Sequence, residues 1–195
     1  MKVIGITGGV GAGKSRILAI LKEEYGARII QADQVAKELE EPGREGLRLL
    51  TEEFGDGILR PDGSLDRAAF AAFIFRDKAA LEKVNELIHP LTWKTIGRMI
   101  EESTAPIVAV EAALFTEETK HICQRLWYVD TEDEIRIVRL MADRGYSREK
   151  CLDIMKNQAG REEFKRISDA VIDNSGTLDE VRRQIALLLQ NYSQD

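Results

Sequence analysis

The feature that most constrains this chain is a glycine-rich run near the amino terminus, Gly8-Gly-Val-Gly-Ala-Gly-Lys-Ser15, which matches the pattern GxxxxGK[ST]. It follows Lys2–Thr7, a short apolar run with β-branched residues that predicts a buried parallel strand. It leads into Gly13–Glu24, where apolar residues recur at helical spacing. A strand, this pattern and a helix in that order are typical of a phosphate-binding loop, whereas an incidental glycine-rich turn would not explain the spacing.

Each residue type in this loop suits a triphosphate. Glycines permit positive φ values and keep Cβ atoms out of the path between backbone N–H groups and phosphate oxygens. The helix that follows directs its positive dipole end at the same anion. Lys14 adds a charge near the β- and γ-phosphates, and the hydroxyl of Ser15 suits Mg²⁺. The residues expected to bind the nucleotide are therefore Gly8, Gly9, Val10, Gly11, Ala12, Gly13, Lys14 and Ser15.

The other strand patterns predict an α/β core with a parallel sheet. Ala27–Ile30 follows the first helix closely, and a strand, a helix and a strand within about 30 residues form a βαβ unit. Further strands are expected at Ile107–Val110, Leu126–Val129 and Ala170–Ile172. Ligands of such sheets collect at the carboxyl ends of the strands, which is where the glycine-rich loop lies.

Between the second and third strands the sequence predicts only helices. In order, these are Val35–Glu40, Glu45–Phe54, Arg67–Phe75, Lys78–Ile88 and Leu91–Glu102. Asp66 and Asp77 are suited to cap two of them. His89-Pro90 is expected to separate the last two, because proline disfavours helical geometry in the residue before it. We interpret this stretch as a helical insertion.

Helix starts are also predicted in the last third of the chain. Thr131 with Glu134, and Thr177 with Glu180, have the spacing of capping boxes. Ser147 is suited to cap a helix between them that ends at about Gln158.

Charge and cysteine content narrow the class of partners. The 195 residues have a formal net charge of −6, so overall charge gives no attraction to nucleic acid or to membrane phosphates. Cys123 and Cys151 belong to no CxxC motif or Cys/His cluster, which fits a reducing cytosol and provides no zinc site. No apolar run approaches ~18 residues, and no signal-peptide pattern is present. We expect a cytoplasmic protein that acts on small molecules; its oligomeric state stays open, with a monomer slightly favoured.

The phosphate loop does not identify the second substrate. A GTPase would read guanine with an NKxD motif, which the sequence lacks, and the DxxG pattern at Asp173–Gly176 comes too late to be a switch. Motor and transport ATPases are usually larger. A small kinase remains, in which inserted helices and an arginine-bearing segment would enclose the acceptor.

An ordered set of short motifs is more specific than the loop. It comprises Thr7 to Ser15, Ala32-Asp33, Glu41-Pro-Gly43, Phe54-Gly55, Asp62-Gly63, Asp66-Arg67, Phe75, His89-Pro90, Gln158 and Asp169 to Gly176. With this set the chain resembles, nearly from end to end, the dephospho-CoA kinases of coenzyme A biosynthesis. The resemblance implies transfer of the γ-phosphoryl group of ATP, with Mg²⁺, to the 3′-hydroxyl of dephospho-CoA, giving coenzyme A and ADP. The alternatives are another small P-loop kinase, of the nucleoside monophosphate or shikimate type, and a catalytically silent ATP-binding regulatory module.

The resemblance also implies an architecture. We expect an α/β fold with a three-layer P-loop kinase core around a parallel five-stranded sheet, a helical acceptor-binding insertion and a small helical lid. The expected boundaries are residues 1–32, 104–131 and 160–195 for the core, 33–103 for the acceptor domain and 132–159 for the lid.

Catalytic roles come from the same resemblance. Asp33, just past the second strand, would be the base that takes the proton of the acceptor hydroxyl. Lys14 and Arg139 would stabilise the charge that develops in transfer. Arg139 is preferred to Arg144 because the family pattern Arg-x-x-x-Arg-Asp is inverted at Asp143-Arg144.

The other candidates would bind substrates. Arg16 and Asn174 are expected near the nucleotide, and Arg67 and His89 near the acceptor. Glu111 closes the third strand, where many phosphate-loop proteins carry a carboxylate for the water shell of the metal.

Structural alternatives stay open for several of these residues. Asp33 could simply cap the helix after it, and Asn174 could belong to an ordinary turn. A single lid arginine, of Arg136, Arg139, Arg144 and Arg148, could instead pair in solvent with an acidic residue at 132–134. His89 is more simply a polar residue at a helix end. Gln31 stands where the family often has a second aspartate, so a carboxylate contribution to Mg²⁺ is missing at that position.

Overall fold

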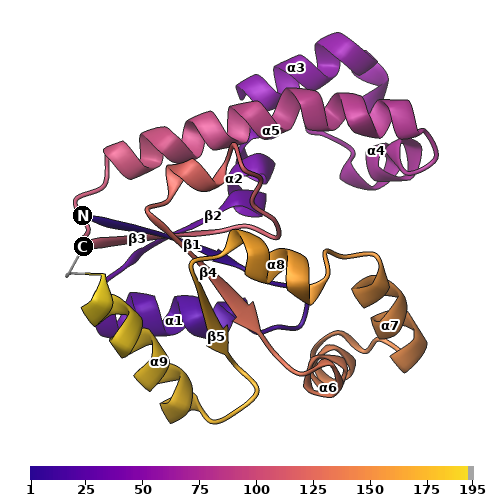
Figure 1. Cartoon of the computed structure of the whole chain (residues 1–195). Helices are drawn as coiled ribbons and strands as arrows, with labels where there is room; N and C mark the ends of the chain where they lie inside the picture. The colour runs from indigo at the N-terminus through magenta and orange to yellow at the C-terminus, as the bar shows by residue number, and fades with distance from the viewer. Residues whose placement is uncertain (193–195) are drawn as a thin grey trace. The chain divides into compact units, whose positions relative to one another are not determined.

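The computed structural model describes residues 1–192, which belong to two compact units (Figure 1). The first unit consists of residues 1–29 and the chain from Ser103 onward, and the second of Ile30–Glu102. The expected division into core, acceptor domain (33–103) and lid (132–159) assigns functions to parts of these units, and it remains a prediction.

A parallel five-stranded sheet is the centre of the first unit, and only the last two residues of one edge strand, Ile30 and Gln31, are counted with the second unit. Its strands are β1 (Lys2–Thr7), β2 (Arg28–Gln31), β3 (Ile107–Glu111), β4 (Arg125–Asp130) and β5 (Ala170–Asp173). They lie in the order β2-β3-β1-β4-β5, with Ile4 of β1 between Ala109 of β3 and Arg125 of β4. The predicted α/β class and parallel sheet are confirmed, and each expected strand is found with its ends moved by at most one residue.

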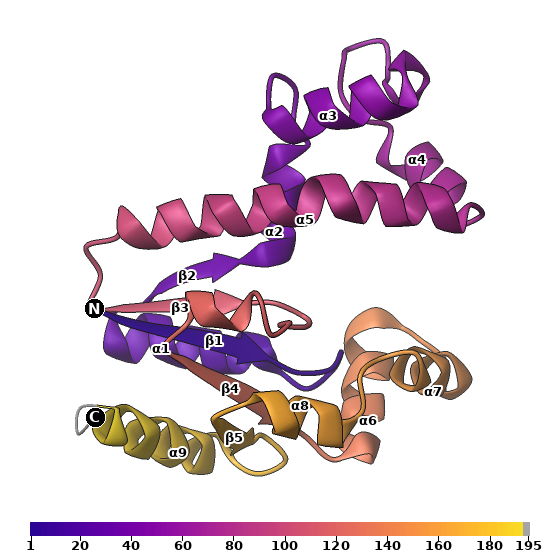
Figure 2. The same ribbon diagram turned by 45° about the horizontal axis from the view of Figure 1, so that its top comes forward.

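Helices cover both faces of this sheet. Those of the first unit are α1 (Lys14–Tyr25), α6 (Asp133–Arg144), α7 (Arg148–Lys156), α8 (Arg161–Ile167) and α9 (Leu178–Asn191), with a 3₁₀ turn, η2 (Lys120–Ile122). α1 and α9 pack on one face (Figure 2), where Leu21 and Ile185 share a core with Trp127. Successive residues of a strand point to opposite faces of a sheet, so Tyr128 points to the face opposite that of Trp127. There its ring stacks on the ring of Phe164 in α8, with 5.0 Å between the ring centroids.

The second unit is helical. Its elements are α2 (Ala32–Leu39), α3 (Glu45–Phe54), α4 (Arg67–Ile74) and α5 (Lys78–Glu101), with a 3₁₀ turn, η1 (Asp56–Ile58). α5 packs against the other three α-helices, and Leu50, Phe70 and Ile88 belong to their shared core. Asp66 and Asp77 cap α4 and α5 as predicted, because their carboxylates accept backbone N–H groups of the first helical turns.

The expected helix break at His89-Pro90 is wrong. α5 runs through both residues as one helix of 24 residues. Proline removes one helical hydrogen bond, at a cost of about 3 kcal/mol or more. The packing of α5 against three helices offsets this cost, and the hydroxyl of Thr92 donates to the carbonyl of Ile88 at 2.8 Å, across the proline. His89 is therefore an exposed mid-helix residue rather than a residue at a helix end.

The expected capping box at Thr131 is also wrong. α6 begins at Asp133 with Glu132 as its cap, and no side chain makes the capping bond. The buried hydroxyl of Thr131 instead lies 2.9 Å from the carbonyl oxygen of Ala12 in the phosphate loop, so a tertiary contact takes the place of the bond from the helix N–H group. The caps at Ser147 and Thr177 are confirmed.

The helix capped by Ser147 ends at Lys156, short of the predicted Gln158, and the sequence patterns miss α8 altogether. α8 has only seven residues, of which Phe164 alone is buried. A helix this short gives too few apolar positions for a periodic pattern.

Candidate active site

The phosphate loop leaves β1 and enters α1 through three glycines with positive φ. These angles are 148° at Gly8, 75° at Gly11 and 83° at Gly13. Residues with a Cβ rarely adopt such angles, so the glycine spacing read from the sequence is a backbone requirement. The N-cap of α1 is Gly13, so no side chain caps the first N–H groups of this helix. The positive end of the helix dipole therefore faces the loop.

The same glycines also make room for protein side chains. A methyl group at Gly9 would collide with the guanidinium of Arg136, and one at Gly13 with the amide of Asn174. One at Gly11 would lie 3.0 Å from Leu140 of α6. The loop is therefore closely packed against α6 and against the turn after β5.

Lys14 is held at the carboxyl ends of two adjacent strands. Its ammonium donates to the carbonyl of Gly8 at 2.8 Å and lies 3.5 Å from a carboxylate oxygen of Glu111, the last residue of β3. Both side chains are mostly buried, with 17% and 13% of their surface exposed. The structure therefore joins the predicted catalytic lysine to the acidic residue that closes the third strand.

Two predicted nucleotide-binding residues, Arg16 and Asn174, and the predicted catalytic Arg139 lie together beside the carbonyl of Ala12. The amide of Asn174, a fully buried residue, donates to this carbonyl at 2.8 Å and accepts from Arg16 at 3.0 Å. Arg139 donates to the backbone carbonyl of Asn174 at 2.9 Å and reaches the Ala12 carbonyl at 3.5 Å. Burial, followed by the charge of Arg16, lowers the pKa of the Arg139 guanidinium.

The arginines after Arg139 are engaged elsewhere. Arg144 lies over the ring of Tyr146, with 6.0 Å between the guanidinium carbon and the ring centroid. Arg148 makes two hydrogen bonds to Glu134, at 2.8 and 2.6 Å. For this arginine the alternative of an ion pair with an acidic residue at 132–134 is therefore observed. Of these arginines, Arg139 is the one that lies against the phosphate loop.

Arg136, one of the predicted lid arginines, and Gln158, a member of the motif set, contact the loop as well, although no contact with Val10 was predicted for either. The Arg136 guanidinium donates to the carbonyl of Val10 at 3.0 Å, and the Gln158 side-chain oxygen accepts the Val10 N–H at 3.0 Å. Arg136, Arg139 and Leu140 are three and four residues apart on α6, which places them on one face. Helical spacing from Arg139 was thus the signal that Arg136 would face the same part of the protein.

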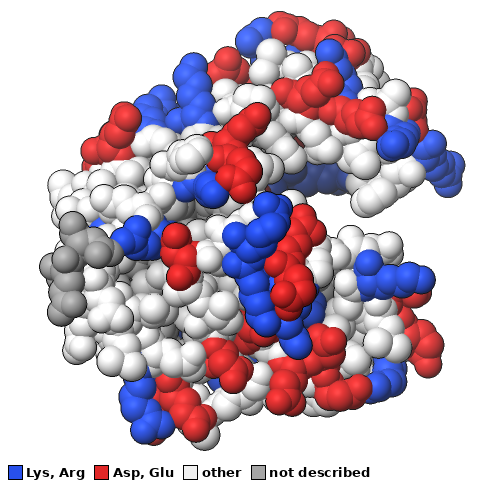
Figure 3. Space-filling model, in the orientation of Figure 1, with Lys and Arg blue, Asp and Glu red and all other residues white. Residues whose placement is uncertain are grey.

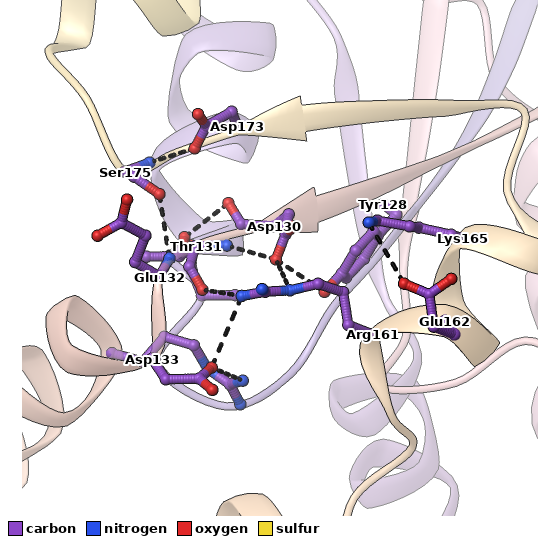
Figure 4. A network of polar contacts seen from close by, with 12 residues as sticks. Tyr128, Asp130, Thr131, Glu132, Asp133, Arg161, Glu162, Lys165, Asp173 and Ser175 are labelled. Carbon is purple, nitrogen blue, oxygen red and sulfur yellow. Dashed lines mark hydrogen bonds and ion pairs between the residues drawn. The ribbon is translucent and has the colours of Figure 1, made fainter.

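A polar network fixes the turn that starts α6 (Figure 4). One carboxylate oxygen of Asp130 accepts from the Tyr128 hydroxyl at 3.0 Å, from the Thr131 N–H at 2.9 Å and from Arg161 at 3.0 Å. Arg161 also donates to the carbonyl of Thr131 at 3.3 Å, which ties α8 to this turn. Burial, and then the Asp130 charge, raises the pKa of Tyr128 to about 12. The network holds in place the threonine that contacts the Ala12 carbonyl.

The predicted acceptor-side residues belong to the second unit. Asp33 is exposed in the first turn of α2, and because Gln31 is the N-cap, the alternative that Asp33 caps this helix is wrong. Arg67, at the start of α4, pairs with Glu40 and Glu41 and donates to the carbonyl of Lys37 at 2.9 Å. Burial raises the pKa of Glu40, while Arg67 opposes that shift.

Neither sign of charge forms one large patch on the face of the protein shown in Figure 3. On the face shown in Figure 3, lysine and arginine are interspersed with aspartate and glutamate.

Among residues 1–192, no group of three or more acidic, histidine or cysteine side chains is arranged to hold a metal ion. None of the helices within those residues has the length and apolar character of a membrane span. Positive charge beside the phosphate loop comes from Lys14, Arg16, Arg136 and Arg139.

A parallel sheet with a glycine-rich phosphate loop between β1 and α1 defines a P-loop fold of the nucleotide-binding class. A model of the dephospho-CoA kinase family matches residues 2–180. The dephospho-CoA kinase of Carboxydothermus hydrogenoformans is 35% identical over 98% of this chain and 95% of its own, and that of Geobacter sulfurreducens is 36% identical over 95% of both. The crystal structure of TT1252 from Thermus thermophilus matches 97% of both chains at 29% identity, with a TM-score of 0.79. The chain belongs to the dephospho-CoA kinase family, and the resemblance seen in its motifs is confirmed.

Proposed function

We propose that this protein transfers the γ-phosphoryl group of ATP to the 3′-hydroxyl of dephospho-CoA, giving coenzyme A and ADP. The observation that carries the proposal is the family match over residues 2–180, in a chain whose phosphate loop has the backbone that nucleotide binding requires. Family membership argues against the nucleoside monophosphate and shikimate kinase alternatives. It also argues against a silent regulatory module.

ATP would bind with its phosphates along Gly8–Ser15. The backbone N–H groups and the α1 dipole would hold the β-phosphate, and Lys14 would shift from the Gly8 carbonyl toward the β- and γ-phosphates. Arg16 and Asn174, already joined beside Ala12, would face the nucleotide from the β5 side.

Mg²⁺ fits this site as a companion of the nucleotide rather than as a resident ion. Mg²⁺ is commonly bound by substrate phosphates together with one or two protein oxygens. The hydroxyl of Ser15, in the first turn of α1, is suited to be such an oxygen, and Glu111 closes the adjacent β3. When bound, the ion would neutralise phosphate charge while the loop fixes its position.

Asp33 is the proposed base. It follows β2 at the carboxyl end of the strand, where ligands of parallel sheets collect, and its exposed carboxylate makes no capping bond that would occupy it. In the transfer step the acceptor oxygen bonds to the γ-phosphorus as its proton passes to Asp33, and ADP leaves. Arg139 would stabilise the charge on the transferring group.

The second unit and α6–α7 would provide the acceptor site and the lid. Arg67 and His89 are the proposed acceptor-binding residues within segment 33–103. Segment 132–159 would close over the phosphates and exclude water, which protects ATP from hydrolysis. We also propose a cytoplasmic location, in keeping with the buried, unpaired cysteines at 123 and 151. The oligomeric state stays open, with a monomer slightly favoured.

ADP release measured with and without dephospho-CoA tests this proposal. We expect dephospho-CoA to raise ADP release well above the rate with ATP alone, and AMP and shikimate to leave it at that background. Stimulation by AMP or shikimate in place of dephospho-CoA would overturn the assignment of the acceptor. An ATP-binding protein without stimulation by any of the three would favour a regulatory module.

A further inference from the structure

The peptide groups of one phosphate-loop residue, Val10, are held by side chains from both ends of segment 132–159. The Val10 N–H donates to the side-chain oxygen of Gln158 at 3.0 Å, and the Val10 carbonyl accepts from Nε of Arg136 at 3.0 Å. Arg136 comes from the first turn of α6, and Gln158 lies two residues beyond α7. We call this set, Val10 with Arg136 and Gln158, the loop clip.

The two side chains of the clip also bind each other. A terminal nitrogen of Arg136 donates to the Gln158 oxygen at 3.3 Å, and Asp133 lies 3.4 Å from the other terminal nitrogen. The Arg136 side chain is only 14% exposed. An arginine fork that is mostly buried and held by three acceptors has one preferred position, so it can transmit the position of α6 to the loop.

Apolar contacts reinforce this connection. The side chain of Val10 packs against a small cluster formed by Ile137 and Leu140 of α6 and Cys151 of α7. Gly9 and Gly11 on either side of Val10 let these side chains approach, because a methyl group at either position would meet Arg136 or Leu140. The loop therefore rests on α6 and α7 through both its backbone and the side chain of Val10.

We propose that Gln158 and Arg136 are positioning residues that couple the conformation of the phosphate loop to segment 132–159, so that ATP affinity depends on the clip. The proposal rests on the nucleotide-binding part of the proposed function. Neither side chain needs to touch the reacting atoms for this role. Because binding couplings are reciprocal, a clip that raises the affinity for ATP also makes ATP hold α6 and α7 more firmly against the loop.

The test replaces the Gln158 amide with an apolar side chain of similar length, Gln158→Met. The matched control is Gln124→Met: the side-chain oxygen of Gln124 likewise accepts a backbone N–H, that of Val3 at the opposite end of β1, at 2.9 Å. We expect Gln158→Met to weaken ATP binding about tenfold, the scale for a backbone N–H that loses its acceptor. The KM for ATP should rise in parallel with kcat nearly unchanged, since ground-state and transition-state binding are lost together. Gln124→Met should leave ATP affinity unaltered.

ATP binding is measured by titration calorimetry without any acceptor, so the result does not depend on which acceptor the enzyme uses. Arg136→Lys, alone and combined with Gln158→Met, completes a double-mutant cycle. We expect the combined loss to be smaller than the product of the single losses, because both residues hold the same peptide.

A second readout is hydrogen exchange of peptides from α7. ATP should slow their exchange in the unaltered protein and do so much less in Gln158→Met. The proposal is overturned if Gln158→Met binds ATP as the unaltered protein does, if it loses only thermal stability to the same extent as Gln124→Met, or if the two substitutions are fully multiplicative.

Discussion

Asn174 offers the sharpest test of how the loop is held from the β5 side. Its side chain is fully buried and makes two hydrogen bonds, to Ala12 and from Arg16. In Asn174→Ala both are lost, at about 1 kcal/mol each, and the small cavity adds about 1 kcal/mol. The Ala12 carbonyl keeps the Thr131 hydroxyl at 2.9 Å, so it is not left unpaired. We expect the free energy of unfolding to fall by roughly 2–3 kcal/mol, which for a chain of this length is a drop in Tm of roughly 4–12 °C.

The isosteric variant Asn174→Asp separates hydrogen bonding from shape. A carboxylate oxygen would replace the amide nitrogen that lies 2.8 Å from the Ala12 carbonyl oxygen, and two acceptors without a proton repel. We expect Asn174→Asp to be less stable than Asn174→Ala at pH 8. Protonation would restore a donor, so the folded state would favour the protonated acid, and the loss should diminish as pH falls toward 5.

Thermal unfolding of the three proteins at pH 5 and pH 8 measures both effects. The reasoning is refuted if Asn174→Asp is as stable as the unaltered protein at pH 8, or if its deficit does not change with pH. An Asn174→Ala protein with an unchanged Tm would show that the contacts to Ala12 and Arg16 contribute nothing to the fold.

Three further predictions concern catalysis and pH. Lys14→Ala should lower kcat/KM by at least about 100-fold, the scale for losing one electrostatic contact to the transition state, while circular dichroism shows the fold intact; an unchanged rate would contradict the role given to Lys14. Asp33→Asn should retain ATP affinity in calorimetry and lose phosphoryl transfer; a parallel loss of both would make Asp33 a binding residue instead of the base. Because burial raises the folded pKa of Tyr128 to about 12, the stability that this neutral hydroxyl provides is complete below about pH 10 and is lost as pH rises to 12. Tyr128→Phe removes that titration, so urea unfolding should show a weaker decline for the variant than for the unaltered protein between pH 10 and 12, and equal slopes would contradict this.

Local signals in the sequence were sufficient for most of the fold. The loop pattern, the β-branched runs and the aspartate caps at 66 and 77 are each determined by a few neighbouring residues, and each was confirmed. The errors occur where distant contacts override local preference. α5 continues through Pro90 because three helices pack along it, and Thr131 leaves its cap because the Ala12 carbonyl is within reach.

The site residues likewise fall into those that local sequence patterns identify and those whose contacts depend on the fold. The glycines, Lys14 and Ser15 can be recognised from spacing, because a phosphate-binding backbone demands those residue types. Asn174 is contacted by both Arg16 and Arg139. These contacts depend on how β5 and α6 pack against the loop, which cannot be predicted from the spacing of the residues in the sequence. Arg136 and Gln158 were singled out in the sequence, but their bonds to the Val10 peptide groups depend on where α6 and the residues after α7 meet the loop.

The most direct test of the account is the identity of the phosphorylated product. The protein is incubated with dephospho-CoA, Mg²⁺ and ATP labelled in its γ-phosphoryl group, and the products are separated and analysed by mass spectrometry. The account predicts label on the 3′-oxygen of the ribose in coenzyme A, in an amount equal to the ADP formed, and almost none with Lys14→Ala. Label found only in inorganic phosphate, or on another hydroxyl, would contradict it.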